Sequence, residues 1–262
     1  NTALKTYPSE AQLWYYLGAI QLKAGDRDQA KQSFDKGIAL NEKEPINYAG
    51  RGYISMLENN AQKAELDFNK ALSLSKSKNI EVLKAVATGY LKDPKLAGKA
   101  TALLEKVKSA GDHDMETLVL LGDAYLAQNN GGKAVTSYEY AASKDPKSAK
   151  PDYSIGLVYL RSRNFKAAEE SFLKAISIDP AYTLAYKELG ELYYQMKEGE
   201  KAVKAYEKYL SLTESPGEGN LRYAFFLFMA KDFEKANNTF EALIKSKNVS
   251  PVTLRYYAFS LY

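Results

Sequence analysis

Residues that could catalyse a reaction or bind a metal are scarce in this sequence. His113 is the only histidine, it lies in the motif Asp112-His113-Asp114, and the chain has no cysteine. Two carboxylates and one imidazole could supply three ligands to a metal ion, but protein zinc sites draw mainly on several His and Cys side chains. We therefore expect the motif to be a solvated turn and the chain to bind no metal.

A second candidate motif, Gly131-Gly132-Lys133, has the composition of a phosphate-binding loop. That loop also needs a second glycine at a fixed spacing and a Ser or Thr after the lysine, which binds the metal ion of the nucleotide. Here the glycine spacing is absent and Ala134 follows the lysine. We expect no catalytic residue and no cofactor, so the sequence predicts that the chain is not an enzyme.

The charges of the chain are nearly balanced. Lys and Arg number 36 and Asp and Glu number 32, for a net charge of +4, and no run of five like charges occurs. Nucleic acid and anionic membrane are therefore not expected as partners. The longest strongly apolar stretch, 225–230, is too short to insert across a bilayer. The absence of cysteine slightly favours an exported or periplasmic bacterial protein and leaves a cytoplasmic one open.

One pattern recurs along the sequence at intervals of about 34 residues. A leucine or isoleucine is followed by glycine, an alanine comes twelve residues after the glycine, and an aromatic residue comes four residues after the alanine. Apolar residues recur at spacings of three and four on both sides of a short turn, which predicts two amphipathic helices per unit. The clearest glycine, alanine and aromatic sets are Gly18, Ala30 and Phe34; Gly122, Ala134 and Tyr138; Gly156, Ala168 and Phe172; and Gly190, Ala202 and Tyr206.

This pattern resembles the tetratricopeptide repeat, and the first unit carries it in full as Trp14-x2-Leu17-Gly18 followed by Ala30-x3-Phe34. The resemblance implies an all-α, right-handed solenoid, or superhelix, of stacked antiparallel helical hairpins that forms one array over residues 1–262. We assign seven repeats, with the end of a preceding repeat in 1–10 and the first helix of an eighth in 251–262. The repeats are 11–44, 45–79, 80–114, 115–148, 149–182, 183–216 and 217–250.

The small residue of the first helix and the alanine of the second are expected to let the two helices approach closely, while the aromatic residue fills the space between hairpins. Two departures from the pattern are the most marked. Arg51 replaces the apolar residue before Gly52, and repeat 80–114 has Pro94 and one extra residue in its turn, so we expect a local irregularity there. The partial repeats at the two ends lead us to expect a fragment of a longer array, whose exposed ends could self-associate.

In the family that this sequence resembles, the first helices line a concave groove, and their second, fifth, ninth and twelfth positions contact ligands. The resemblance therefore implies a protein–protein interaction scaffold or adaptor that binds a peptide or protein segment, of unknown identity, in this groove. Following the fifth, ninth and twelfth positions predicts a binding surface at Tyr15, Tyr53, Met56, Lys84, Asp123, Tyr153, Leu157, Lys187, Glu191, Tyr194, Phe225 and Phe228.

Several of these assignments have simple alternatives. The aromatic residues could pack against adjacent first helices, above all at the twelfth position, and Lys187 and Glu191 could form an ordinary ion pair four residues apart. Some members of the family grip the C-terminal tail of chaperones through a clamp of Lys and Asn, but this chain has Tyr15, Ala19, Ala49 and Gly50 at those places, so no such clamp is expected.

Two other roles also agree with the repeats. The array could be a structural or oligomerisation spacer, or it could be the substrate-presenting arm of a larger multidomain protein.

Helical periodicity in every repeat predicts a circular dichroism spectrum dominated by α-helix. A repeat of 34 residues with two helices leaves no room for strands, so a strand content above about a tenth, measured by far-ultraviolet circular dichroism, would contradict the repeat assignment.

Overall fold

The computed structural model describes residues 6–213, 217–245 and 251–261, with the side chains of 217 and 218 left out. The fold is all-α: 79% of the residues are helical, and the described residues contain no strand. Parts of the predicted segments 1–10, 183–216, 217–250 and 251–262 fall outside the described residues. None of the helices in the described ranges is long and apolar enough to cross a membrane.

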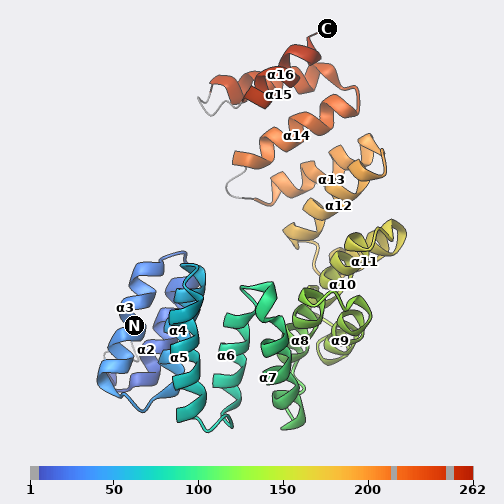
Figure 1. Cartoon of the computed structure of the whole chain (residues 1–262). Helices are drawn as coiled ribbons and strands as arrows, with labels where there is room; N and C mark the ends of the chain where they lie inside the picture. Colours follow the sequence, from blue (N-terminus) through green and yellow to red (C-terminus); the bar gives the residue numbers. More distant parts are fainter. Residues whose placement is uncertain (1–5, 214–216, 246–250, 262) are drawn as a thin grey trace. The chain divides into compact units, whose positions relative to one another are not determined.

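The helices pair into consecutive hairpins that stack as in a solenoid (Figure 1). In each hairpin, the helix that comes first in the chain is called the first helix and the one that follows it the second helix. The hairpins are α2 (Ala11–Lys23) with α3 (Arg27–Leu40), α4 (Pro45–Leu57) with α5 (Ala61–Leu74), α6 (Ile80–Tyr90) with α7 (Ala97–Ser109), α8 (Met115–Ala127) with α9 (Gly131–Lys144), α10 (Lys150–Arg161) with α11 (Phe165–Ile178), α12 (Thr183–Gln195) with α13 (Gly199–Ser211), and α14 (Gly217–Met229) with α15 (Phe233–Lys245). A last helix, α16 (Pro251–Ser260), follows.

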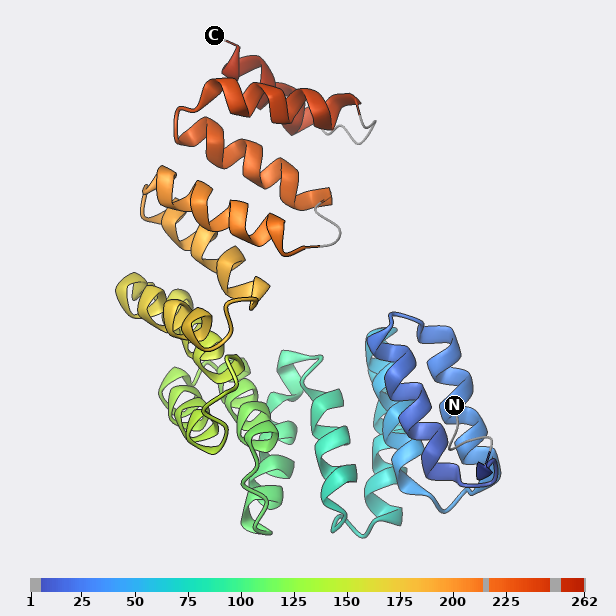
Figure 2. The ribbon, with the colours of Figure 1, turned by 180° about the vertical axis from the view of Figure 1, so that it is seen from behind.

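The chain divides into two compact units, which we call unit 1 (residues 1–144) and unit 2 (residues 145–262). In unit 1 the first helices lie side by side, since α4 packs against both α2 and α6. In unit 2, α14 packs against α16 and each second helix packs against the next first helix. Seen from behind, the same succession of hairpins is visible within each unit (Figure 2).

The turn inside most hairpins repeats one backbone conformation. Residues at corresponding places in these turns adopt a positive φ, and five of them are not glycine; the set is Gly25 (85°), Asn59 (58°), Asn129 (60°), Arg163 (58°), Lys197 (64°) and Lys231 (65°). The next residue is usually Asp or Asn, and its side chain accepts a hydrogen bond from a backbone N–H in the first turn of the second helix, as at Asp26, Asn60, Asn130, Asn164 and Asp232. Such caps satisfy amides that the helix itself cannot.

The third hairpin lacks this turn. Pro94 holds its φ near −65° and cannot adopt the positive value. A short 3-10 helix, η1 (Pro94–Leu96), forms instead, and the side chain of Asp93 accepts a hydrogen bond from the N–H of Lys95 at 2.9 Å. The irregularity expected from the sequence is therefore located in the turn between α6 and α7.

In every hairpin but the third, whose second helix has Leu104 at this place, the core contains a buried ring from the second helix. Where the small residue of the first helix is glycine, the ring lies against it. A Cβ added to Gly122 would be 2.4 Å from Tyr138, one added to Gly156 would be 2.4 Å from Phe172, and both rings are fully buried. Phe34 also lies against Gly50 of the next hairpin, at 2.5 Å from an added Cβ. The ring thus determines both how close the two helices of a hairpin come and how the next hairpin stacks.

Arg51, the charged residue that interrupts the apolar pattern, forms ion pairs with carboxylates of two hairpins. Arg51 on α4 donates two hydrogen bonds, of 2.9 and 2.7 Å, to the carboxylate of Asp67 on α5, and a third of 3.0 Å to Asp35 on α3. The hydrogen bonds from Arg51 to Asp67 outweigh partial burial and raise the pKa of Arg51 above its ordinary value. Arg51 therefore joins two successive hairpins by ion pairs.

We expect Gly122→Ala to destabilise unit 1 by about 1–3 kcal/mol, the usual cost of forcing an extra methyl group into a packed core. The buried ring of Tyr138 leaves no space for the new methyl group. The matched control is Gly98→Ala on α7, where nothing lies within 4 Å of the added Cβ. Urea unfolding of both variants measures the difference, and equal stabilities would show that the ring does not require glycine.

Candidate functional site

A groove of about 900 Å³ runs along unit 1 on the side formed by the first helices. Its floor includes the ring of Phe34 and the backbone of Gly50, so the groove lies directly above the contact that stacks the first two hairpins. Its walls come from α2, α4, α6 and α8. They are Tyr15, Tyr16, Ala19, Leu22, Lys23, Ala49, Tyr53, Ile80, Glu81, Lys84, Ala85, Thr88, Glu116 and Leu120.

Three residues that the sequence predicted for a binding surface lie together in this groove: Tyr15 on α2, Tyr53 on α4 and Lys84 on α6. Two others of unit 1 lie elsewhere. Met56 is buried in the core, so it offers little surface to a partner. Asp123 accepts a hydrogen bond of 2.6 Å from the hydroxyl of the buried Tyr138, which makes it part of the hairpin's own structure.

The groove also contains polar residues that the sequence prediction missed, chiefly Tyr16, Glu81 and Glu116. Glu81 and Glu116 occupy the second position of α6 and α8. That position belongs to the ligand-contacting set of the family, so following it as well as the fifth, ninth and twelfth would have found both. Tyr16 stands beside a predicted position, and no periodic signal marks it.

Lys84 lies at the centre of a group of carboxylates. Its ammonium is 3.0 Å from Asp114, 3.0 Å from Glu116 and 3.8 Å from Asp112. Burial lowers the pKa of Lys84, but its hydrogen bonds to Glu116 and Asp114 outweigh that effect and raise it above its ordinary value. Both carboxylates of the Asp112-His113-Asp114 motif therefore form ion pairs with Lys84. The described residues contain no group of three or more His, Cys, Asp or Glu side chains that could hold a metal ion.

Glu81 receives two hydrogen bonds from α2, on the other side of α4. The hydroxyl of Tyr16 donates to one carboxylate oxygen at 2.8 Å, and the side-chain amide of Gln12 donates to the other at 3.2 Å. Nearby Tyr15 is half-buried, and burial together with the negative charge of Glu81 raises its pKa to about 12. The Tyr15 hydroxyl therefore stays protonated, and able to donate a hydrogen bond, throughout the neutral pH range.

The predicted residues of unit 2 are largely occupied by contacts within that unit. The ring of Tyr153 lies 5.3 Å from that of Tyr182 and 5.9 Å from that of Phe172, and Leu157 packs against the same core. Lys187 on α12 is partly buried. Glu191 pairs with Arg222 of α14, whose Nε donates a hydrogen bond of 2.7 Å to the Glu191 carboxylate, and not with Lys187.

The other aromatic residues predicted for unit 2 contact one another across successive first helices. The ring of Phe225 on α14 lies 5.4 Å from that of Tyr194 on α12 and 4.8 Å from that of Tyr256 on α16. Phe228 lies 6.0 Å from Tyr256. These contacts are the packing between adjacent first helices that the sequence analysis named as the alternative to a binding surface.

Comparison with known proteins agrees with this architecture. Models described as "Tetratricopeptide repeat" match residues 11–44, 119–183 and 153–218. No curated protein shows a significant sequence match. Among solved structures, a tetratricopeptide repeat protein from Parabacteroides merdae is 19% identical with a TM-score of 0.61, over 97% of this chain and 99% of that one.

Two further structures are similar. The structure of PilF from Pseudomonas aeruginosa is 18% identical, with a TM-score of 0.53 over 98% of this chain and 99% of that one. A chain of the APC/C hetero-tetramer Cut9-Hcn1 is 15% identical, with a TM-score of 0.60 over 81% of this chain. The match spans only 42% of that longer chain. At these identities the likeness shows the fold.

The ion pairs at Lys84 predict a pH-dependent contribution to stability from Asp114. Burial alone would raise the pKa of Asp114, but the hydrogen bonds from the Thr117 N–H and from Lys84 lower it below its ordinary value of 3.8. The ionised carboxylate therefore stabilises the fold above pH 3.8, and this contribution disappears as the pH falls through the lower, folded-state pKa.

We expect Asp114→Ala to cost about 1 kcal/mol at neutral pH, because it removes the N-cap of α8 as well as the ion pair. Asp114→Asn keeps a capping oxygen and should cost less. Urea unfolding at pH 7 and below the ordinary pKa of 3.8 checks this. A stability difference between the Asp114→Asn variant and the original chain that grew on acidification would show that the carboxylate does not act as described.

Proposed function

Because this chain belongs to the tetratricopeptide repeat family, we propose that it is a non-catalytic scaffold or adaptor that holds an extended peptide segment of another protein in the groove of unit 1. The family consists in general of protein–protein interaction scaffolds. The observation that carries the proposal is that unit 1 contains an open groove of about 900 Å³ lined by half-buried tyrosines and small apolar residues.

The dimensions of the groove suit a peptide. Packed helices lie about 8–10 Å apart, so the three adjacent first helices α2, α4 and α6 span roughly 16–20 Å. An extended chain covers that distance in about five or six residues at roughly 3.3 Å each. The volume also lies within the range of about 300–1,000 Å³ that is usual for ligand sites.

The side chains of the groove suit a peptide as well. Tyr15 and Tyr53 offer large aromatic faces with few rotatable bonds, and tyrosine is enriched at the residues that dominate binding energy in protein interfaces. Ala19, which is partly exposed, leaves room for a partner's side chain beside Tyr15. The hydroxyl of Tyr15 and that of Thr88 provide hydrogen-bonding groups at the two sides of the groove.

The experiment begins with selection of random dodecapeptides displayed on phage against the chain of 262 residues. A selected peptide is then labelled and titrated by fluorescence anisotropy. We expect Tyr53→Ala to weaken binding by about 1–3 kcal/mol, or roughly 5- to 150-fold in Kd, because it removes an aromatic contact at the centre of the groove.

The matched control is Tyr140→Ala, which removes an equally large and partly exposed aromatic residue from α9, outside the groove. It should leave the Kd unchanged, and thermal unfolding should show that both variants are folded. Failure to select any peptide, or binding that survives Tyr53→Ala unchanged, would contradict the proposal.

A further inference from the structure

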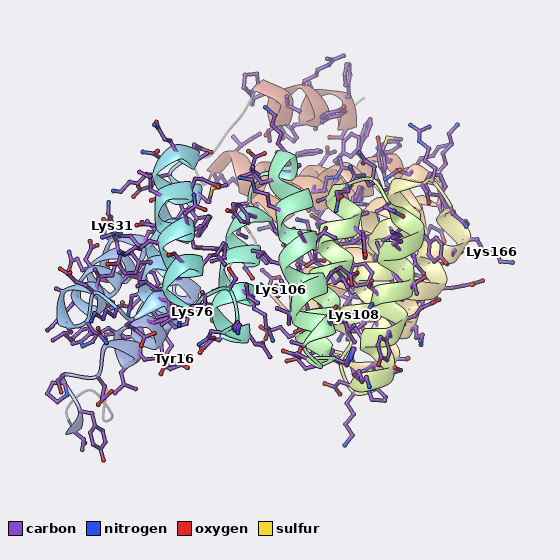
Figure 3. All side chains as sticks on the ribbon, turned by 60° about the horizontal axis from the view of Figure 1, so that its bottom comes forward. Tyr16, Lys31, Lys76, Lys106, Lys108 and Lys166 are labelled. Carbon is purple, nitrogen blue, oxygen red and sulfur yellow. The ribbon has the colours of Figure 1, made fainter. Side chains whose placement is uncertain are left out.

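The charges that line the groove balance, with two lysines and two glutamates, but they are unevenly distributed. The chain as a whole is basic, with a net charge of +4. Many of its lysines lie on second helices, outside the groove; Lys31 on α3, Lys106 on α7 and Lys166 on α11 are examples (Figure 3). The wall formed by α6 and the start of α8, in contrast, presents Glu81 and Glu116 to the groove. Carboxylates therefore gather on one wall of the groove, although the chain as a whole is basic.

Lys84 does not neutralise this wall. Its single ammonium is shared by Asp112, Asp114 and Glu116, so three carboxylates surround one positive charge. The other lysine that lines the groove, Lys23, stands seven residues after Tyr16 on α2, a rise of about 10 Å along the helix. A surplus of negative charge therefore remains on the side of the groove near Tyr16 and Glu81.

Glu81 is the carboxylate that is held in place without being neutralised. Its hydrogen bonds come from two uncharged donors, the Tyr16 hydroxyl and the Gln12 amide. In the part of the chain that the structure describes, Glu81 forms no ion pair with a lysine or arginine. A carboxylate has about four acceptor positions, so after these two hydrogen bonds both oxygens can still accept from a further donor.

The negative charges of Glu81 and Glu116 both act on Tyr15. Tyr15 lies in the groove beside Tyr16, and the charges of Glu81 and Glu116 both contribute, after burial, to the raised pKa of its hydroxyl. Both carboxylates therefore act on the part of the groove at Tyr15, whereas the ring of Tyr53 has the ammonium of Lys92 over it at 5.2 Å. A polyanion such as nucleic acid would be repelled near Tyr15, whereas a cationic side chain would be attracted.

We propose that the occupant of this groove is a basic peptide segment, and that one of its arginine or lysine side chains pairs with Glu81 while neighbouring apolar side chains lie against Tyr15 and Tyr53. The proposal rests on the peptide-binding function proposed above. The aliphatic stem of a lysine or arginine can lie along an aromatic face with its charged end at the carboxylate, which suits both parts of the groove. Charge-assisted hydrogen bonds of this kind are about twice as strong as those between neutral groups.

The test uses the same random dodecapeptide library and the same full chain. We expect the selected peptides to share a lysine or arginine at one aligned position. With a labelled peptide of that kind, Glu81→Gln should weaken binding about 10-fold or more, because the amide keeps an acceptor for Tyr16 but loses the charge. Added salt should weaken binding to the original chain much more than binding to the variant.

The matched control is Glu58→Gln, which removes the same charge from a residue of unit 1 that pairs with Lys31 and does not line the groove. It should leave the Kd unchanged. As a second variant, Glu81→Lys should lose the basic peptide and bind a peptide whose aligned basic residue has been replaced by glutamate, a gain that misfolding could not produce.

The outcomes separate the two proposals. Selected peptides that lack a shared basic residue, or whose affinity is the same for Glu81→Gln as for the original chain, overturn the basic-peptide inference. If those peptides still depend on Tyr53, the groove-binding function stands. Peptides whose binding is insensitive to Tyr53→Ala overturn the function, and the inference with it.

Discussion

The contact between a buried ring of the second helix and a glycine of the first is the constraint on which most of this structure depends. A ring such as Phe34 lies against Gly18 of its own hairpin and Gly50 of the next, so one side chain sets two helix–helix distances. The same ring forms part of the floor of the groove. Core packing and site geometry are therefore coupled in unit 1. The contact between Phe34 and Gly50 fixes the rotation of α4 about its axis, and this rotation determines which residues of α4 face the groove.

Most of the fold could be predicted from the sequence, because its rules are local and repeated. The spacing of glycine, alanine and aromatic residues indicated helical hairpins, and the structure and the family comparison confirm a solenoid of the tetratricopeptide kind. The sequence predicted that the glycine of the first helix allows the two helices of a hairpin to approach closely. It did not predict that the aromatic ring of the second helix lies directly against this glycine. The positive φ at Arg163, Lys197 and Lys231 could not be read from residue type, because it is imposed by the turn and not favoured by those side chains.

The candidate site was less predictable, because a position on a helix fixes the direction of a side chain but not what that side chain meets. Tyr53 and Met56 both lie on α4 at predicted positions, yet Met56 turns into the core while Tyr53 lines the groove. The aromatic residues predicted in unit 2 meet equally large neighbours from the next first helix, so their surfaces are used in packing. Only the three-dimensional arrangement distinguishes these cases from Tyr15, whose ring also contacts a core ring, Phe34 at 5.9 Å, but lines the groove beside Ala19.

The hydrogen bonds from Gln12 and Tyr16 to Glu81 join hairpins that are not neighbours in the stack. Repeat arrays are usually described as one-dimensional systems in which each unit interacts only with its immediate neighbours, so that terminal units can fray one at a time. Here the first hairpin is tied to the third across α4. Opening the first hairpin must therefore break these hydrogen bonds to the third hairpin as well as the interface with the second, so the stabilities of the first and third hairpins are coupled.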